Sequence, residues 1–168
     1  HLFDITPDYD LDIMKPGQDL YTITSNVLLG LKLVLLDFKP DLVFVHGDTS
    51  TTFAASLSSF YQQISVAHIE AGLRTGDIYS PWPEEANRKL TTQITKYFFT
   101  PTITSKNNLL KENVNNEHIV ITGNTVVDAL FLALAKIKSS EQIQLEIINA
   151  LAANSYVINN DRKMILVT

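Results

Sequence analysis

The sequence predicts an α/β fold, built on a parallel β-sheet with helices on both faces. Short apolar runs alternate along the chain with longer segments whose apolar residues recur every three or four positions. The short runs, such as LVFVH and SVAHI, are too apolar to have a solvated face, which is typical of strands in a covered parallel sheet. Polar turns follow these runs, at the strand ends where such sheets bind ligands.

The elements follow one another in a regular order. Residues 19–38 form the first predicted helix, because apolar residues recur on one face, Asp19 can cap the first turn, and Lys39-Pro40 ends the pattern. After it, strands are predicted at residues 42–46, 65–69, 97–100 and 118–122, and helices around 53–61, 83–96, 104–113, 126–138 and 141–153. A polar link then leads to MILVT, residues 164–168, which is predicted to be a new strand.

Length and composition narrow the function classes. The 168 residues fit one domain, or one domain with part of another. The formal charge is -5 and the basic residues are scattered, so no nucleic-acid partner is expected. Without cysteine there are no disulfides or thiolate metal sites. The most apolar segment, residues 27–36, is too short to span a membrane, and no signal peptide is visible, so a cytoplasmic location is expected.

The first polar cluster is HGDTSTT, residues 46–52, which follows a predicted strand. Gly47 permits a tight turn, and the amides and hydroxyls at the start of the next helix could hold an anionic group. The alternative is structural: Asp48 or Thr49 simply caps that helix.

The second cluster is HIEAGLRTG, residues 68–76. His68 and Glu70 share a face, because alternate residues of a strand point the same way. A carboxylate just beyond a buried strand is costly unless it is paired or used, so Glu70 is a candidate for chemistry. The alternative is that Arg74 is its salt-bridge partner.

The third cluster is SPWPEEANRKL, at the start of a predicted helix. Glu84 with Arg88, and Glu85 with Lys89, have the four-residue spacing of ordinary surface pairs, and acids are favourable in a first helical turn. A well-capped surface helix would explain this cluster by itself. However, three acid-bearing turns converge on one sheet edge, and convergent acids favour general acid–base catalysis.

A metal site is a rival interpretation, because His46-x-Asp48 and His68-x-Glu70 are two pairs of hard ligands. Such sites need more histidines, and His1 and His118 lie elsewhere, so no metal is expected. The glycine patterns of dinucleotide-binding and P-loop proteins are absent from the sequence, so no cofactor of those classes is expected.

The chain closely resembles the non-hydrolysing UDP-N-acetylglucosamine 2-epimerases in four ordered blocks, which are VHGDTSTT, AHIEAGLRTGDIYSPWPEEANRKLT, FFTPT and ITGNTVVDAL. The resemblance implies a GT-B-type pair of Rossmann-like domains facing a cleft. It also implies interconversion of UDP-GlcNAc and UDP-ManNAc at sugar C2 by elimination and re-addition of UDP, without metal or nicotinamide. The product would supply ManNAc for surface polysaccharide. A cytoplasmic homodimer, joined through the first domain, is implied as well.

The resemblance also assigns residues. The catalytic acids of the family match Asp48, Glu70 and Glu84, while Glu85 keeps only a capping role. The implied substrate-binding residues are Arg88, which would hold anionic substrate, and His46, Thr49, Arg74 and Asn124.

Family members begin with an earlier strand and continue into a second domain. The resemblance therefore implies a chain truncated at both ends, with a partial N-terminal Rossmann-like domain at residues 1–138, an inter-domain helix and linker at 139–162, and the first strand of the C-terminal nucleotide-binding domain at 163–168. Two alternatives stay open. One is a hydrolysing epimerase that releases ManNAc and UDP, and the other is a catalytically silent module for sugar-nucleotide binding or docking.

Overall fold

The computed structural model describes residue 3 and residues 5–159. The chain divides into two compact units, one of residues 6–125 and one that includes the residues from Val126 onward. The predicted strand at residues 164–168 lies outside the described residues. The domain boundaries expected after residues 138 and 162 stay predictions.

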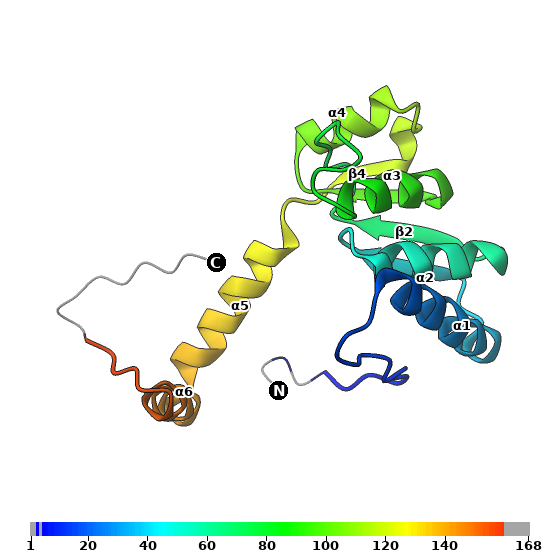
Figure 1. The fold of residues 1–168 in the computed structure, drawn as a ribbon. Helices are drawn as coiled ribbons and strands as arrows, with labels where there is room; N and C mark the ends of the chain where they lie inside the picture. The colour runs from blue at the N-terminus through cyan, green and yellow to red at the C-terminus, as the bar shows by residue number, and fades with distance from the viewer. Residues whose placement is uncertain (1–2, 4, 160–168) are drawn as a thin grey trace. The chain divides into compact units, whose positions relative to one another are not determined.

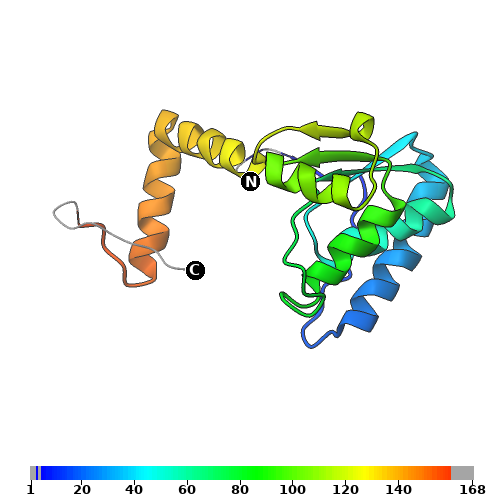
Figure 2. The same ribbon diagram turned by 90° about the horizontal axis from the view of Figure 1, so that it is seen from above.

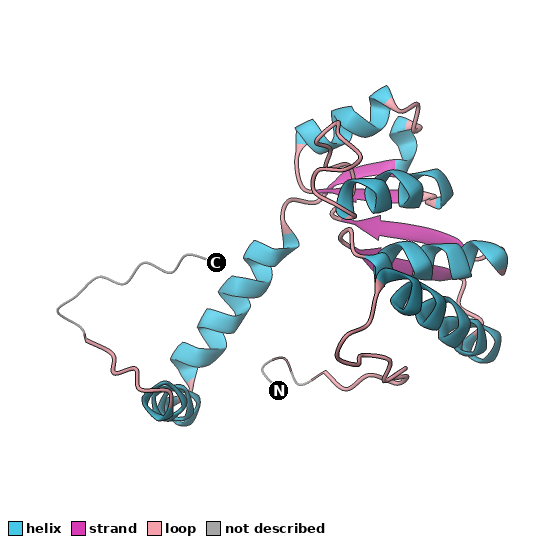
Figure 3. Ribbon diagram, viewed as in Figure 1, coloured by secondary structure: helices cyan, strands magenta, loops and turns pink. Residues whose placement is uncertain are grey.

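The first unit is built on a four-stranded parallel sheet (Figures 1 and 3). Its strands, in spatial as in chain order, are β1 Leu42–His46, β2 Ser65–Ile69, β3 Tyr97–Thr100 and β4 Ile119–Ile121. His46 pairs with Ile69, which pairs in turn with Phe99, so the strands end at one edge. The predicted α/β class and parallel sheet are confirmed.

The crossover helices all lie on one side of this sheet (Figure 2). They are α2 Ser50–Tyr61, α3 Glu84–Ile94 and α4 Ile103–Lys111, and a 3₁₀ turn at Asn116–His118 precedes β4. Each strand is added beside the previous one, and right-handed crossovers in one direction place their helices on one face.

The core lies between the sheet and these helices. Four residues in register across the sheet, Val45, His68, Phe98 and Ile119, are buried on the helix side. On the other side the rings of Phe44 and Phe99 stack with centroids 5.9 Å apart, and Phe44 stays 57% exposed. Residues 6–125 thus cover one face with their own helices, whereas the prediction placed helices on both.

Helix α1, Leu20–Phe38, begins where it was predicted to begin. The Asp19 carboxylate accepts a hydrogen bond of 2.7 Å from the Thr22 N–H and caps the first turn. By length and composition alone, the 19 residues of α1 are long and apolar enough to cross a membrane. The expectation drawn from residues 27–36 alone therefore underestimated the length of the apolar helix. It packs instead on α2, where Ser58 and Gln62 donate to carbonyl groups of α1.

The second unit contains α5 Thr125–Ser139 and α6 Glu141–Ala153. The Ser140 hydroxyl accepts from the Ile143 N–H at 3.3 Å and so caps α6. This cap explains why a single residue separates the two helices, where the sequence predicted two.

Gly72 is fixed by close packing of its loop against α4. A Cβ atom at Gly72 would lie 2.3 Å from the Ser105 carbonyl oxygen, and its φ is +87°. We expect Gly72→Ala to lower the free energy of unfolding by about 1–3 kcal/mol more than Gly76→Ala, because the clash adds to the backbone strain. Gly76 is the matched control, with a φ of +88° and nothing within 4 Å. Urea unfolding of both variants measures the difference, and equal losses would contradict the packing explanation.

Candidate active site

The turns after β1 and β2 lie against each other at the carboxyl edge of the sheet. The Gly47 N–H donates to the Ile69 carbonyl at 3.1 Å. A carboxylate oxygen of Glu70 lies 3.6 Å from the position that a Cβ would take at Gly47. Parallel pairing of the two strands thus brings together the clusters that contain Asp48 and Glu70.

The backbone of the first turn is held by side chains from three different elements. The Thr52 hydroxyl donates to the His46 carbonyl at 2.7 Å, and the Asn87 amide donates to the Asp48 carbonyl at 2.9 Å. Between them, His68 Nε2 lies 2.7 Å from the Gly47 carbonyl. Gly47 has a φ of +75°, which favours glycine. Three consecutive carbonyls therefore have a side-chain donor each.

The ionisation state of His68 follows from this geometry. A carbonyl oxygen only accepts, so Nε2 carries the proton, while Nδ1 is buried and has no hydrogen-bond partner among the described residues. Burial lowers the pKa of His68; the hydrogen bond to Gly47 opposes this, and the charge of Arg74 adds to the lowering. The ring nitrogen left with a free lone pair is Nδ1, and that atom is buried. Within the described part of the chain, no three His, Asp or Glu side chains converge in a metal-ligating group.

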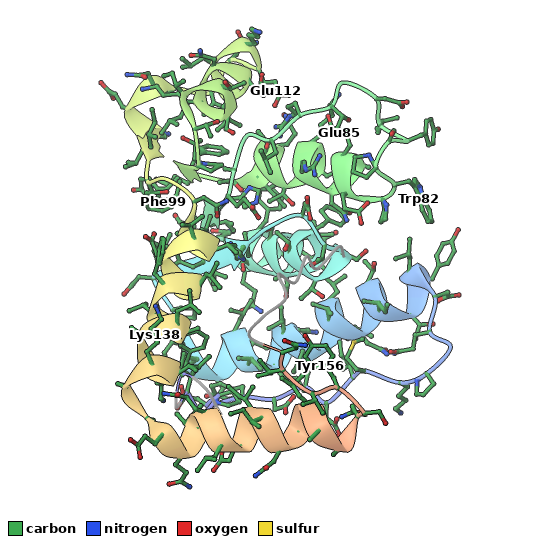
Figure 4. The ribbon with its side chains drawn as sticks, turned by 90° about the vertical axis from the view of Figure 1, so that its left-hand side faces the viewer. Trp82, Glu85, Phe99, Glu112, Lys138 and Tyr156 are labelled. Carbon is green, nitrogen blue, oxygen red and sulfur yellow. The ribbon has the colours of Figure 1, made fainter. Side chains whose placement is uncertain are left out.

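Arg88, on α3, binds two carboxylates. Its Nη2 and Nε donate to one oxygen of Asp48 at 2.7 and 3.0 Å, and its Nη1 donates to Glu85 at 3.0 Å. Glu85 is fully buried, and its other oxygen accepts from the Gly76 N–H at 3.3 Å (Figure 4). This network joins the β1 turn, the start of α3 and the loop before it.

The network sets the charge of Glu85. Burial raises the pKa of Glu85, but the hydrogen bonds from Arg88 and from the N–H groups of Thr75 and Gly76 outweigh it, so the pKa lies below its ordinary value. For Arg88, burial lowers the pKa, and the bonds to Glu85 and Asp48 outweigh that and raise it. Both groups are therefore charged at neutral pH.

The predicted role of Glu85 as a surface cap was wrong, as were the pairs Glu84–Arg88 and Glu85–Lys89. Successive helix residues are about 100° apart, so only one of two adjacent glutamates can point inward. Glu85 points inward, where it meets Arg88 three positions later. Glu84 is the first residue of α3 and is half-buried; no hydrogen bond or ion pair to its carboxylate occurs among the described residues.

Directly after β2, the backbone changes from extended to left-handed at Glu70. Its φ of +68° lies in the left-handed region, which is strained for a residue with a side chain and is often found at functional sites. It is half-buried, and in residues 5–159 no donor or cation contacts its carboxylate. Glu70 and Glu84 therefore differ from Asp48 and Glu85, which share one arginine.

Arg74 does not pair with Glu70, contrary to the alternative drawn from the sequence. It forms a two-point ion pair with Glu112, with Nε and Nη2 each 2.7 Å from a carboxylate oxygen. The reason is the packing of Gly72 against α4, which directs the chain toward that helix before Arg74 is reached. Glu112, labelled in Figure 4, directly follows α4 as its C-cap residue.

The remaining predicted residues are placed as follows. Thr49 is the N-cap of α2 and accepts from the Thr52 N–H, which confirms the capping interpretation for that residue. His46 ends β1 and is exposed, and Asn124 is exposed in the loop after β4. The roles of Asn87, His68 and Glu85 were missed, because a side chain's bond to a distant turn leaves no spacing signal.

Comparisons with known proteins agree with this architecture. A family model described as UDP-N-acetylglucosamine 2-epimerase matches residues 1–168. The UDP-N-acetylglucosamine 2-epimerase of Escherichia coli K12 is 59% identical over 167 residues, which is 99% of this chain and 43% of that protein. The enzyme of Campylobacter jejuni is 52% identical over 168 residues. The chain therefore spans less than half the length of these relatives.

Solved structures show the same fold. The UDP-GlcNAc 2-epimerase of Neisseria meningitidis, bound to UDP-GlcNAc, aligns with a TM-score of 0.81 at 56% identity, over 90% of this chain and 41% of that one. The Methanocaldococcus jannaschii enzyme, in complex with UDP-GlcNAc and UDP, gives 0.78 at 39% identity, over 88% and 39% of the two chains.

The two adjacent glutamates give a matched test of this site. Glu85→Ala should cost about 3–5 kcal/mol of unfolding free energy, because it leaves Arg88 buried with one partner fewer. Glu84→Ala should cost less than about 1 kcal/mol, the usual value of a helix-dipole contact. The stabilisation by Glu85 should be present above its ordinary pKa of 4.5 and disappear as the pH falls through its lower folded value. Denaturant unfolding at pH 7 measures the free-energy cost of each substitution, and equal costs for Glu84→Ala and Glu85→Ala would contradict the assignment.

Proposed function

Because the chain belongs to the UDP-N-acetylglucosamine 2-epimerase family, we propose that it carries catalytic acids for interconverting UDP-GlcNAc and UDP-ManNAc at sugar C2. The observation that carries the proposal is the meeting of the turns that contain Asp48 and Glu70 at the carboxyl edge of the sheet, in a chain that matches the family over its described length. Relatives whose structures hold UDP-GlcNAc or UDP support the class of substrate.

The reaction inverts C2, so it needs proton transfer on two faces of one sugar. One group removes the C2 proton while the C1–oxygen bond to UDP breaks, which leaves 2-acetamidoglucal. UDP then adds back at C1, and a second group delivers a proton to the opposite face of C2. Glu70 follows β2 and Glu84 begins α3, and their carboxylates lack partners among the described residues. We assign the two proton transfers to this pair.

Asp48 has a different role in this proposal, because Arg88 holds one of its carboxylate oxygens with two donors. It supplies a fixed negative charge and an oriented acceptor beside the sugar. Arg88 is occupied by Asp48 and Glu85, so we assign it to the acids and not to the anionic substrate. His46, Thr49 and Asn124 remain proposed substrate contacts, whereas Arg74 is bound by Glu112.

A homodimer, formed through the first unit, is proposed for the assembled protein. Helix α1 presents an apolar stripe of exposed side chains, Leu29, Leu33 and Leu36, which is larger than single scattered residues. Burying this stripe against a second copy would remove it from water.

Light scattering should give twice the monomer mass, and Leu33→Lys should shift the measured mass toward that of the monomer. We place the enzyme in the cytoplasm, where its product UDP-ManNAc would supply ManNAc for surface polysaccharide.

A hydrolysing reaction is the second candidate, since the same acids could serve it with water in place of returning UDP. The products separate the two: an epimerase yields UDP-ManNAc, and a hydrolysing enzyme yields free ManNAc and UDP. A silent module would bind UDP-GlcNAc in calorimetry without forming either.

Turnover is best tested in the complete gene product that includes residues 1–168. With UDP-GlcNAc in deuterated water we expect UDP-ManNAc, with deuterium at C2 of both sugars. Glu70→Gln and Glu84→Gln should each lower kcat by about 10²–10⁴, the usual contribution of a positioned acid or base. Glu117→Gln, on the 3₁₀ turn before β4, is the control and should keep full activity. Unchanged kcat in the two site variants would overturn the assignment.

A further inference from the structure

The three side chains that hold the β1 turn have a common target. Thr52, His68 and Asn87, here called the carbonyl clamp, donate to the consecutive carbonyls of residues 46, 47 and 48. We propose that the carbonyl clamp is the positioning device that fixes Asp48 relative to Glu70 and Glu84. This inference rests on the proposed function, since it concerns how the proposed acids are held for one substrate.

The turn needs such partners because its backbone leaves the sheet. β1 ends at His46, so the carbonyls after it have no neighbouring strand to bond, and each accepts from a side-chain donor instead. All three clamp residues are buried, with exposures of 5% for Thr52, 1% for His68 and 6% for Asn87. Packing therefore fixes the rotamers of these three side chains, so that their short hydrogen bonds can fix the position of the turn.

The origin of each clamp residue points beyond backbone satisfaction. His68 lies on β2, two residues before Glu70, and Asn87 lies on α3, three residues and about one turn after Glu84. Each of these donors is therefore rigidly linked to one proposed acid and bonds to the backbone that carries the third. A carboxylate oxygen of Glu70 also lies 3.6 Å from the position that a Cβ would take at Gly47. The clamp joins the three acids through one turn.

His68 acts here as a neutral donor and not as a catalytic base. Its Nε2 proton is donated to Gly47, and its Nδ1 is buried, with no partner in the part of the chain that the structure describes, so neither nitrogen is exposed for proton transfer. Asn87 likewise contacts backbone through its amide. Both are positioning residues, whose effect on chemistry passes through Asp48.

A purely structural role predicts different kinetics. If the donors only satisfied the carbonyls of the turn, their loss would lower stability, yet the protein that stays folded would turn over normally. If they position Asp48, kcat falls in the folded protein while the KM for UDP-GlcNAc stays nearly constant. Misplacement of a catalytic group by about 1 Å can cost on the order of 100-fold.

The experiment measures kcat, KM and the unfolding midpoint for the complete gene product and four variants. His68→Leu removes the donor, and His68→Gln places an amide N–H near the position of Nε2. Asn87→Asp replaces the donor by an acceptor of the same size. Thr91→Val is the matched control, because Thr91 is equally buried on α3 but its hydroxyl bonds to nothing in the described chain.

We expect His68→Leu and Asn87→Asp to lower kcat by roughly 10- to 100-fold with KM changed less than threefold. His68→Gln should stay within about threefold of wild type, and Thr91→Val should be unchanged. Folded His68→Leu and Asn87→Asp proteins with wild-type kcat would overturn the inference. Should His68→Leu not fold, the other pair decides: His68→Gln must be active and Asn87→Asp slow, and any other pattern contradicts the clamp. Absence of turnover in the wild type would instead refute the proposed function.

Discussion

The buried guanidinium of Arg88 is the charge around which this site is assembled. A cation whose side chain is 12% exposed needs carboxylate partners, because removing one leaves uncompensated charge in a poorly solvated place. Its partners are Asp48, after β1, and Glu85, in the first turn of α3. One side chain thereby fixes the strand end, the helix start and, through the Gly76 N–H bound to Glu85, the intervening loop.

This arrangement divides the acids into two classes. Asp48 and Glu85 accept hydrogen bonds from Arg88, so their negative charges stabilise the structure and orient Asp48. The carboxylates of Glu70 and Glu84 have no partner in the described chain and so remain available for proton transfer. Four acids near one sheet edge thus do not act alike. The difference follows from which of them reach Arg88.

Backbone geometry contributes the second part of the site. Gly47 and Glu70 both adopt left-handed conformations directly after their strands, and the two turns face each other because the strands are paired in parallel. Gly72 then allows the chain to touch α4, which carries Arg74 to Glu112 instead of Glu70. A salt bridge that looked natural from four-residue spacing is therefore replaced by one across 38 positions of sequence.

By itself, the sequence determined the alternation of strands and helices, the start of α1 at Asp19 and the limits of α6. It also determined that polar turns gather at one sheet edge. These features can be predicted because periodicity and capping are local properties of the chain. The sequence also indicated Asp48, Glu70 and Glu84, through their place after strands or at a helix start and through the family resemblance. Only the tertiary structure decided that Glu85 is buried while Glu84 is not, that Arg88 binds Asp48, and that His68 and Asn87 reach the β1 turn. The contacts of His68, Asn87 and Arg88 with the β1 turn join residues 21, 39 and 40 positions apart, and the packing of α3 and β2 at the strand ends selects these partners, which no local pattern records.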